Sequence, residues 1–152
     1  MTQPTFLREW YDRVSHTQRA HYRSADHFGR KSYALGIPVI ALSTLVGTSV
    51  FATLQKQPSL WLQIAVGLAS VVAAVLASLQ TFLGWAARAE KHRIAGAKYG
   101  AVGRELEAML ESTNTPTDEQ IAKLREKLDT LALESPNNPL GIYRGAKQQT
   151  TG

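Results

Sequence analysis

Four histidines and a cluster of glycines are the residues whose types could do chemistry in this chain of 152 residues. Three histidines lie on an arginine-rich stretch near the N-terminus and His92 lies far from them, so no metal-ligand spacing is formed. The chain has no cysteine, which excludes a thiolate ligand and a cysteine nucleophile. No nucleophile, base and orienting group can be combined with any specificity. We therefore expect no metal, no cofactor and no enzymatic activity. His92 is interpreted as a buried structural histidine rather than a ligand or pH switch.

Gly96, Gly100 and Gly103 would lie within about 60° of one another on a helix. Their spacing lacks the Gly-Lys-Ser/Thr ending of a phosphate loop and does not follow a strand, so nucleotide binding through them is not expected. Each glycine costs roughly 1 kcal/mol relative to alanine inside a helix. Three glycines on one face therefore indicate that another backbone lies very close, and we expect the N-terminal helix to pack there.

The elements that must position these residues follow from the uneven distribution of charge. Residues 32–87 contain a single charge, Lys56, and all other Asp, Glu, Lys and Arg side chains lie outside this segment. The charge-free runs 32–55 and 57–87 each exceed the roughly 20 residues with which a helix crosses a bilayer. A soluble chain of this length has too little other apolar sequence to bury two such helices on all sides. The pattern excludes an ordinary soluble enzyme domain and predicts two membrane spans.

The sequence predicts four helical segments and no strands. Spans at about 35–54 and 60–87 are joined by the short turn Gln55–Ser59, so the second span must return antiparallel beside the first. We expect an all-α membrane protein, a two-span antiparallel transmembrane hairpin with long helices extending into a cytoplasmic helical bundle. The predicted divisions are a cytoplasmic amphipathic helix at 1–31, the transmembrane hairpin at 32–87, cytoplasmic helices at 88–139 and a flexible tail at 140–152.

Three local features are predicted along these helices. Pro38 is expected either to begin the first span or to kink it against the preceding helix. The second span is expected to continue as one helix from Leu60 to Leu110, because the helical pattern persists beyond it. Thr117 and Gln120 fit a capping box that begins a short amphipathic helix.

Basic residues gather on one side of the predicted hairpin. Six Lys and Arg precede the first span and four more follow the second closely, against one in the turn. Both termini are therefore expected in the cytoplasm. The predicted interfacial anchors are Trp61, Trp85, Arg30, Lys31 and Arg88. Anionic lipid is the expected partner of the basic residues, and acidic residues dilute the positive charge enough that no nucleic acid is expected.

Both spans carry a face of small and hydroxylated side chains. The candidate pore-lining residues are Gln63, Ser70, Ser78, Thr81, Ser43, Thr44 and Thr48. The candidate helix-packing residues are Gly47, Gly67, Gly96, Gly100 and Gly103. In one interpretation the small residues let the two spans approach closely, with hydroxyls bonding across the interface. In the other, part of this face lines a water path in a ring of several copies, because two spans cannot enclose a pore alone. The spans hold no Asp, Glu, Arg or His, which argues against a proton relay or an ion-coupled transporter.

Five sequence motifs carry a resemblance to a known family. They are Leu35-Gly36-Ile37-Pro38-Val39, Leu45-Val46-Gly47-Thr48-Ser49-Val50-Phe51, Ser78-Leu79-Gln80-Thr81-Phe82, Ala89-Glu90-x-His92-Arg93-x-Ala95-Gly96-x2-Tyr99 and Arg104-Glu105-Leu106-Glu107. Through them the chain resembles the bacterial SLATT family of two-span membrane effector domains, which are found with nucleotide-signalling conflict systems. The resemblance implies a pore-forming effector whose trigger comes from a separate nucleotide-sensing partner or from a second messenger bound by the cytoplasmic helices.

The function expected from the residues and the resemblance is that of a homo-oligomeric pore or membrane-disrupting effector of bacterial anti-phage defence. It is expected in the bacterial inner membrane. The alternative is a non-conducting membrane anchor or scaffold, whose cytoplasmic bundle recruits a partner protein. Dye leakage from liposomes separates the two, because only the first permeabilises a bilayer.

Overall fold

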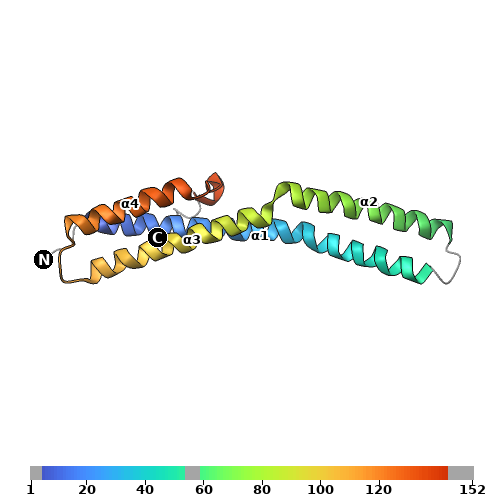
Figure 1. Ribbon diagram of the computed structural model, residues 1–152, viewed down its shortest axis with the longest axis horizontal. Helices are drawn as coiled ribbons and strands as arrows, with labels where there is room; N and C mark the ends of the chain where they lie inside the picture. The colour runs from blue at the N-terminus through green and yellow to red at the C-terminus, as the bar shows by residue number, and fades with distance from the viewer. Residues whose placement is uncertain (1–4, 54–58, 144–152) are drawn as a thin grey trace. The chain divides into compact units, whose positions relative to one another are not determined.

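The computed structural model describes residues 5–53 and 59–143, which form helices and no strand. The helices are α1 (Thr5–Thr53), α2 (Leu60–Leu83), α3 (Trp85–Glu111) and α4 (Asp118–Glu134) (Figure 1). The predicted all-helical fold with two long apolar helices is confirmed. Residues 55–58 of the predicted turn Gln55–Ser59 and the end of the predicted tail, 144–152, lie outside the described residues. Before them, residues 140–143 form a turn of helix, in which the N–H groups of Ile142 and Tyr143 donate to Pro139 O at 3.0 and 3.1 Å.

The N-terminal helix and the first span are one helix rather than two. α1 runs 49 residues through Pro38, with no boundary between 31 and 35. Proline removes the hydrogen bond that its own N–H would donate, and its ring crowds the carbonyl of the residue four positions earlier. Proline inside a membrane-spanning helix is tolerated because neighbouring groups and small local adjustments satisfy the freed backbone groups.

The second span and the helix that follows are separate, contrary to the single helix predicted from Leu60 to Leu110. α2 ends at Leu83, and Gly84 adopts a left-handed conformation with φ 57° and ψ 32°. The Gly84 N–H donates to Gln80 O at 3.3 Å, which closes α2 before α3 begins at Trp85. Glycine has no Cβ and enters this conformation without a steric penalty, so the break falls there.

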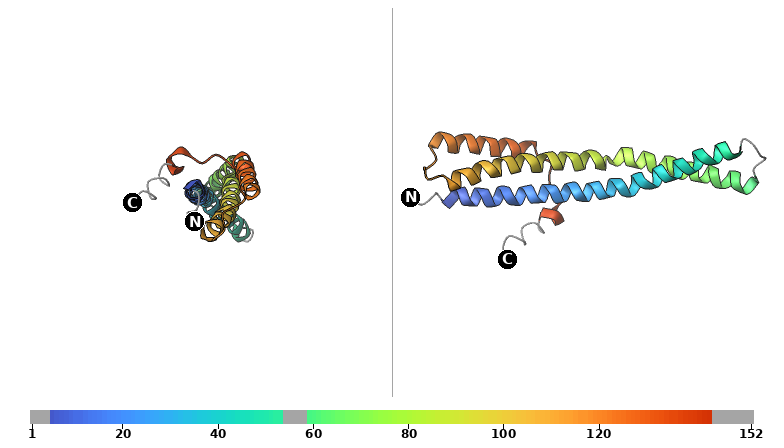
Figure 2. Two further views of the ribbon diagram at one scale, coloured as in Figure 1. Left: turned by 90° about the vertical axis from the view of Figure 1, so that its left-hand side faces the viewer. Right: turned by 90° about the horizontal axis from the view of Figure 1, so that it is seen from below.

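The chain divides into two compact units. The first, which we call the bundle, comprises residues 1–27 and 88–152, and Figures 1 and 2 show α4 folded back along α3 within it. Leu7 of α1, Leu106 of α3 and Leu124 of α4 are each at most 1% exposed, so all three helices contribute to one core. Each such leucine stabilises the fold by about 1.5–3 kcal/mol. The buried core cluster is Leu7, Val14, Tyr99, Val102, Leu106, Leu124 and Leu131.

The fourth helix begins as the sequence predicts. Thr117 accepts from the Gln120 N–H at 3.3 Å and the Gln120 side chain accepts from the Thr117 N–H at 2.9 Å, which confirms the capping box. Two otherwise unpaired backbone donors are thereby satisfied. α4 packs on α3 through Leu124 and Leu131 and carries ion pairs to it, Lys127 to Glu105 and Glu134 to Lys98, both at 2.7 Å.

The second unit, which we call the hairpin, comprises residues 28–87 and pairs α2 with the C-terminal part of α1 (Figures 1 and 2). Its closest helix contact at a glycine is at Gly36, where a Cβ would lie 3.2 Å from the Gln80 side-chain nitrogen. Ala73 is the one buried residue of α2. A two-helix hairpin therefore leaves most of its apolar surface uncovered.

Candidate functional site

The outer surface of the hairpin is apolar. Two helical stretches are long and apolar enough to cross a membrane, and 0% and 6% of their most apolar windows are buried. The core helix of a soluble protein would be mostly buried, whereas here Ile40, Leu68 and Phe82 are 68%, 64% and 85% exposed. Side chains of this kind are stable in contact with acyl chains. The hairpin thus has the surface of a membrane-spanning element.

The hydroxyls of the candidate pore lining bond within their own helices. Thr44 and Thr48 donate to Ile40 O and Thr44 O at 2.8 and 2.9 Å. On α2, Ser70, Ser78 and Thr81 donate to the carbonyl four residues earlier at 2.8, 2.8 and 3.1 Å. Because each hydroxyl has one proton, these five cannot also donate across the helix pair. Within one chain, these five protons are therefore used inside the helices rather than between the two spans.

The hydroxylated face points largely away from the helix pair. Ser70 is half-buried, while the other candidate lining residues, Gln63, Ser43, Thr44, Thr48, Ser78 and Thr81, are exposed. The face is therefore available to a second chain, to lipid or to water.

Gly47 and Gly67 do not bring the two spans of one chain together. A Cβ built at either position meets nothing within 4 Å. Close packing at these glycines therefore requires another molecule, since the hairpin itself leaves the space open. The close contact at a glycine is instead the one between Gln80 and Gly36.

The candidate interfacial anchors are exposed or partly exposed. Trp61, at the start of α2, is 80% exposed. At the other end of the hairpin the Lys31 ammonium lies 5.5 Å from the centre of the half-buried Trp85 ring, a cation–π contact. Arg30 and Arg88 are exposed. A ring and a cation held together in this way suit the headgroup layer, where amphipathic side chains are favoured.

The three glycines of α3 face the N-terminal part of α1. A Cβ at Gly96 would lie 3.3 Å from the Tyr22 ring, and one at Gly103 would lie 3.6 Å from Val14. A Cβ at Gly100 would lie 2.6 Å from the Gln18 side-chain nitrogen, closer than real Cβ atoms approach. These α1 contacts recur every four residues, along one face of the helix. Because these three α3 residues are glycines without a side chain, α1 can pack close to the α3 backbone.

A buried histidine pair lies beside this contact. His21 of α1 and His92 of α3 are 2% and 3% exposed, and their Nδ1 atoms are 3.0 Å apart, so one ring donates to the other. The His21 ring also stacks on Tyr99, with centroids 5.5 Å apart. Burial lowers the pKa of His21 to about 4, with the charge of His92 as the second cause, and burial also lowers the pKa of His92. Both rings are therefore neutral at pH 7.

Sequence reasoning assigns His92 to a buried face but does not identify its partner. His21 lies 71 residues earlier in the sequence. Helical periodicity indicates which face of each helix is apolar, but it does not show which face of α1 contacts which face of α3. The available signal is that His21 shares the three-or-four spacing of the apolar face of α1, which predicts burial. Across the described residues, no three His, Cys, Asp or Glu side chains gather where they could hold a metal ion.

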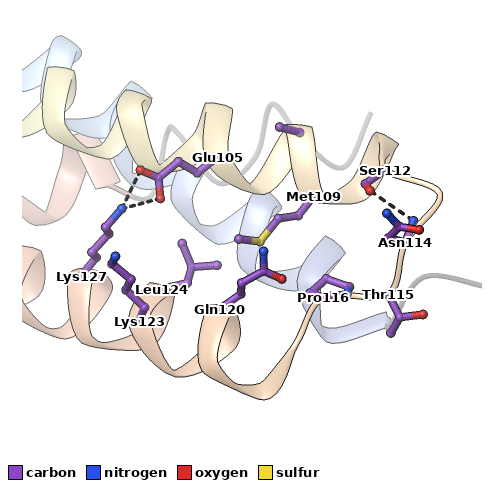
Figure 3. A pocket seen from close by; sticks show the side chains of 11 residues that line it. Glu105, Met109, Ser112, Asn114, Thr115, Pro116, Gln120, Lys123, Leu124 and Lys127 are labelled. Carbon is purple, nitrogen blue, oxygen red and sulfur yellow. Dashed lines mark hydrogen bonds and ion pairs between the residues drawn. The ribbon is translucent and has the colours of Figure 1, made fainter.

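A cavity of about 490 Å³ opens at the turn between α3 and α4 (Figure 3). One of its lysines, Lys127, reaches both carboxylate oxygens of Glu105 at 2.7 Å. The N-terminus of α4 at this cavity is already capped by Thr117 and Gln120, with two acidic residues in its first turn. These negative charges disfavour an anion at a helix N-terminus. The cavity is formed by the turn and by the adjoining ends of α3 and α4.

Comparison with known proteins identifies one family. The sequence matches the family described as SMODS and SLOG-associating 2TM effector domain family 4 over residues 4–150, nearly the whole chain. No curated protein and no solved structure matches it.

Proposed function

The chain belongs to the SMODS and SLOG-associating 2TM effector domain family 4, a family of two-span effector domains, and on that basis we propose that it is a homo-oligomeric, membrane-permeabilising effector of a bacterial conflict system. In this proposal the protein resides in the inner membrane with both termini in the cytoplasm. A separate sensor or a signalling nucleotide triggers assembly or opening, and the resulting leak arrests or kills an infected cell. The chain itself performs no enzymatic step.

One observation carries the proposal. The hairpin exposes a face of small and hydroxylated residues, including Gly67 and Ser78, that its own partner helix does not cover. Small residues are the usual contact between helices in a membrane, because they let backbones approach closely. Several hairpins packed through Gly67 bring their hydroxylated faces together. A ring of such faces offers water an uncharged path, which discriminates poorly between ions.

Purified protein in dye-loaded liposomes tests the proposal. Wild-type protein is expected to release dye, and Gly67→Leu is expected to reduce both release and oligomer size. A Cβ at Gly67 meets nothing within 4 Å in the single chain and the residue is exposed, so we expect the hairpin itself to remain intact. The matched control is Ala65→Leu, which places the same leucine side chain two residues away on the opposite face of α2.

The outcomes separate the pore from the anchor. Leakage by wild-type protein and by Ala65→Leu, together with loss in Gly67→Leu, supports the pore. A folded oligomer that releases no dye, with or without nucleotides added, contradicts it and favours the non-conducting anchor that recruits a partner protein through the bundle.

A further inference from the structure

A second cavity, of about 430 Å³, opens in the bundle between α1 and α4. Its volume lies within the range of sites that bind small molecules. Trp10 and Arg13 come from α1, Arg125 and Asp129 from α4, and Tyr99 of α3 also lines it. We call this cavity the α1–α4 groove. It differs from the cavity of Figure 3 in having aromatic rings in its lining and arginines in place of lysines.

Two guanidinium groups, those of Arg13 and Arg125, and one carboxylate, that of Asp129, line the groove, so positive charge is in excess. The ion pairs found among the described residues join Arg93 to Glu90, Lys98 to Glu134 and Lys127 to Glu105, and none involves Arg13 or Arg125. Both arginines are exposed, so their charges are accessible from solvent. Arginine is the residue best suited to phosphate, because its planar fork donates two parallel hydrogen bonds.

Aromatic rings adjoin these charges. The Arg125 guanidinium lies 5.9 Å from the centre of the Trp10 ring, so charge and ring share one wall of the groove. Tyr143, in the helical turn after α4, also lines the groove and is 46% exposed. Planar bases stack on rings of this kind. Asp129 adds a carboxylate that can accept hydrogen bonds from the N–H groups of a base.

We propose that the α1–α4 groove binds a nucleoside phosphate, with Arg13 and Arg125 on the phosphate and Tyr143 stacked on the base. Because the two arginines come from different helices, the bound phosphate ties α1 to α4. Tyr99 also lines the groove, and its ring stacks on His21. A nucleotide bound in the groove therefore affects the packing between α1 and α3. This inference rests on the proposed function in one respect: it gives a chemical class to the signal that triggers the effector. Nucleotide binding itself can be measured whether or not the protein permeabilises a membrane.

Calorimetric titration of the full chain in nanodiscs tests the proposal. The probes are AMP, GMP, CMP and UMP, with inorganic phosphate and the four unphosphorylated nucleosides as comparisons. At least one monophosphate is expected to bind, and to bind more tightly than either phosphate or its own nucleoside. Arg13→Ala and Arg125→Ala should each weaken binding about tenfold or more, because each removes charged hydrogen bonds worth about 1.5–3 kcal/mol.

Three variants sharpen the test. Arg8→Ala is the matched control, since Arg8 is an exposed arginine of α1 that does not line the groove, and it should bind as wild type does. Tyr143→Ala should weaken binding, whereas Tyr143→Phe keeps the ring and should restore it. Helical content measured by circular dichroism confirms that each variant folds.

Several outcomes would overturn the proposal. They are absence of binding by every monophosphate, equal binding of inorganic phosphate, equal binding of the nucleosides, and an equal loss in Arg8→Ala. The two proposals can fail separately. Nucleotide binding without dye release supports the nucleotide site and contradicts the pore. Dye release without nucleotide binding supports the pore and contradicts the nucleotide site.

Discussion

The buried histidine pair makes the stability of the bundle depend on pH. Both His21 and His92 have a lowered pKa in the folded protein, and that of His21 falls from 6.5 to about 4. Above pH 6.5 the rings are neutral in both folded and unfolded chains, so pH has no effect through them. As the pH falls from 6.5 toward 4, these histidines become protonated in the unfolded chain but stay neutral in the folded chain. Protonation therefore favours the unfolded state, and the bundle loses stability.

The size of the loss follows from the His21 shift. Each pKa unit corresponds to about 1.4 kcal/mol, so a lowering from 6.5 to about 4 gives a loss of up to about 3 kcal/mol from His21. His92 adds in the same direction. A change of this size is a large part of the 5–15 kcal/mol that stabilises a typical domain.

Chemical unfolding between pH 7.5 and 4.5, followed by circular dichroism on the full chain in detergent, measures this loss. Carboxylates also titrate near the lower limit, so the double variant His21→Gln/His92→Gln serves as the comparison. It should lose most of the pH dependence between 6.5 and 4.5. His16→Gln, on the same helix outside the pair, should keep it. An unchanged pH profile in the double variant would falsify the assignment of the effect to the pair.

Two further predictions concern the bundle and the topology. Gly100→Leu should destabilise the bundle by about 1–3 kcal/mol through overpacking, because Gly100 is buried against α1 and a leucine there needs space for its whole side chain as well as displacement of the Gln18 side chain. The neighbouring, exposed Ala101→Leu should unfold as wild type does in the same denaturant titration. Equal midpoints for the two variants would contradict this packing. The chain has no cysteine, so an impermeant maleimide added to intact spheroplasts should label Ser59→Cys and should label Thr115→Cys only after lysis. The reverse pattern would place the termini outside.

Much of the fold could be predicted because it follows from local composition. The absence of charge over residues 32–87, apart from Lys56, identifies the hairpin, since lipid excludes ionised side chains. The capping box at Thr117 is likewise a local signal, complete within four residues. The glycines of α3 predict a close neighbour because each has a cost in a helix that only packing can offset.

What could not be predicted depends on contacts between distant segments or on a single backbone conformation. The break at Gly84 requires one residue to adopt a positive φ, and the apolar periodicity on either side gives no sign of it. The pairing of His21 with His92 depends on which face of α1 meets α3. Tyr143, assigned by composition to a flexible tail, lies in a helical turn and lines the α1–α4 groove. Burial and contact in these cases are properties of the assembled bundle.

The hydroxyls that donate to their own helix backbone allow the hairpin to persist in two different solvents. Thr44, Ser70 and Ser78 leave no unbonded proton pointing outward, so acyl chains surround them without the penalty of a bare donor. Their remaining lone pairs can still accept hydrogen bonds from water. In the proposed function, this means that a single copy is stable in the bilayer and that the same residues can be hydrated without refolding when copies assemble.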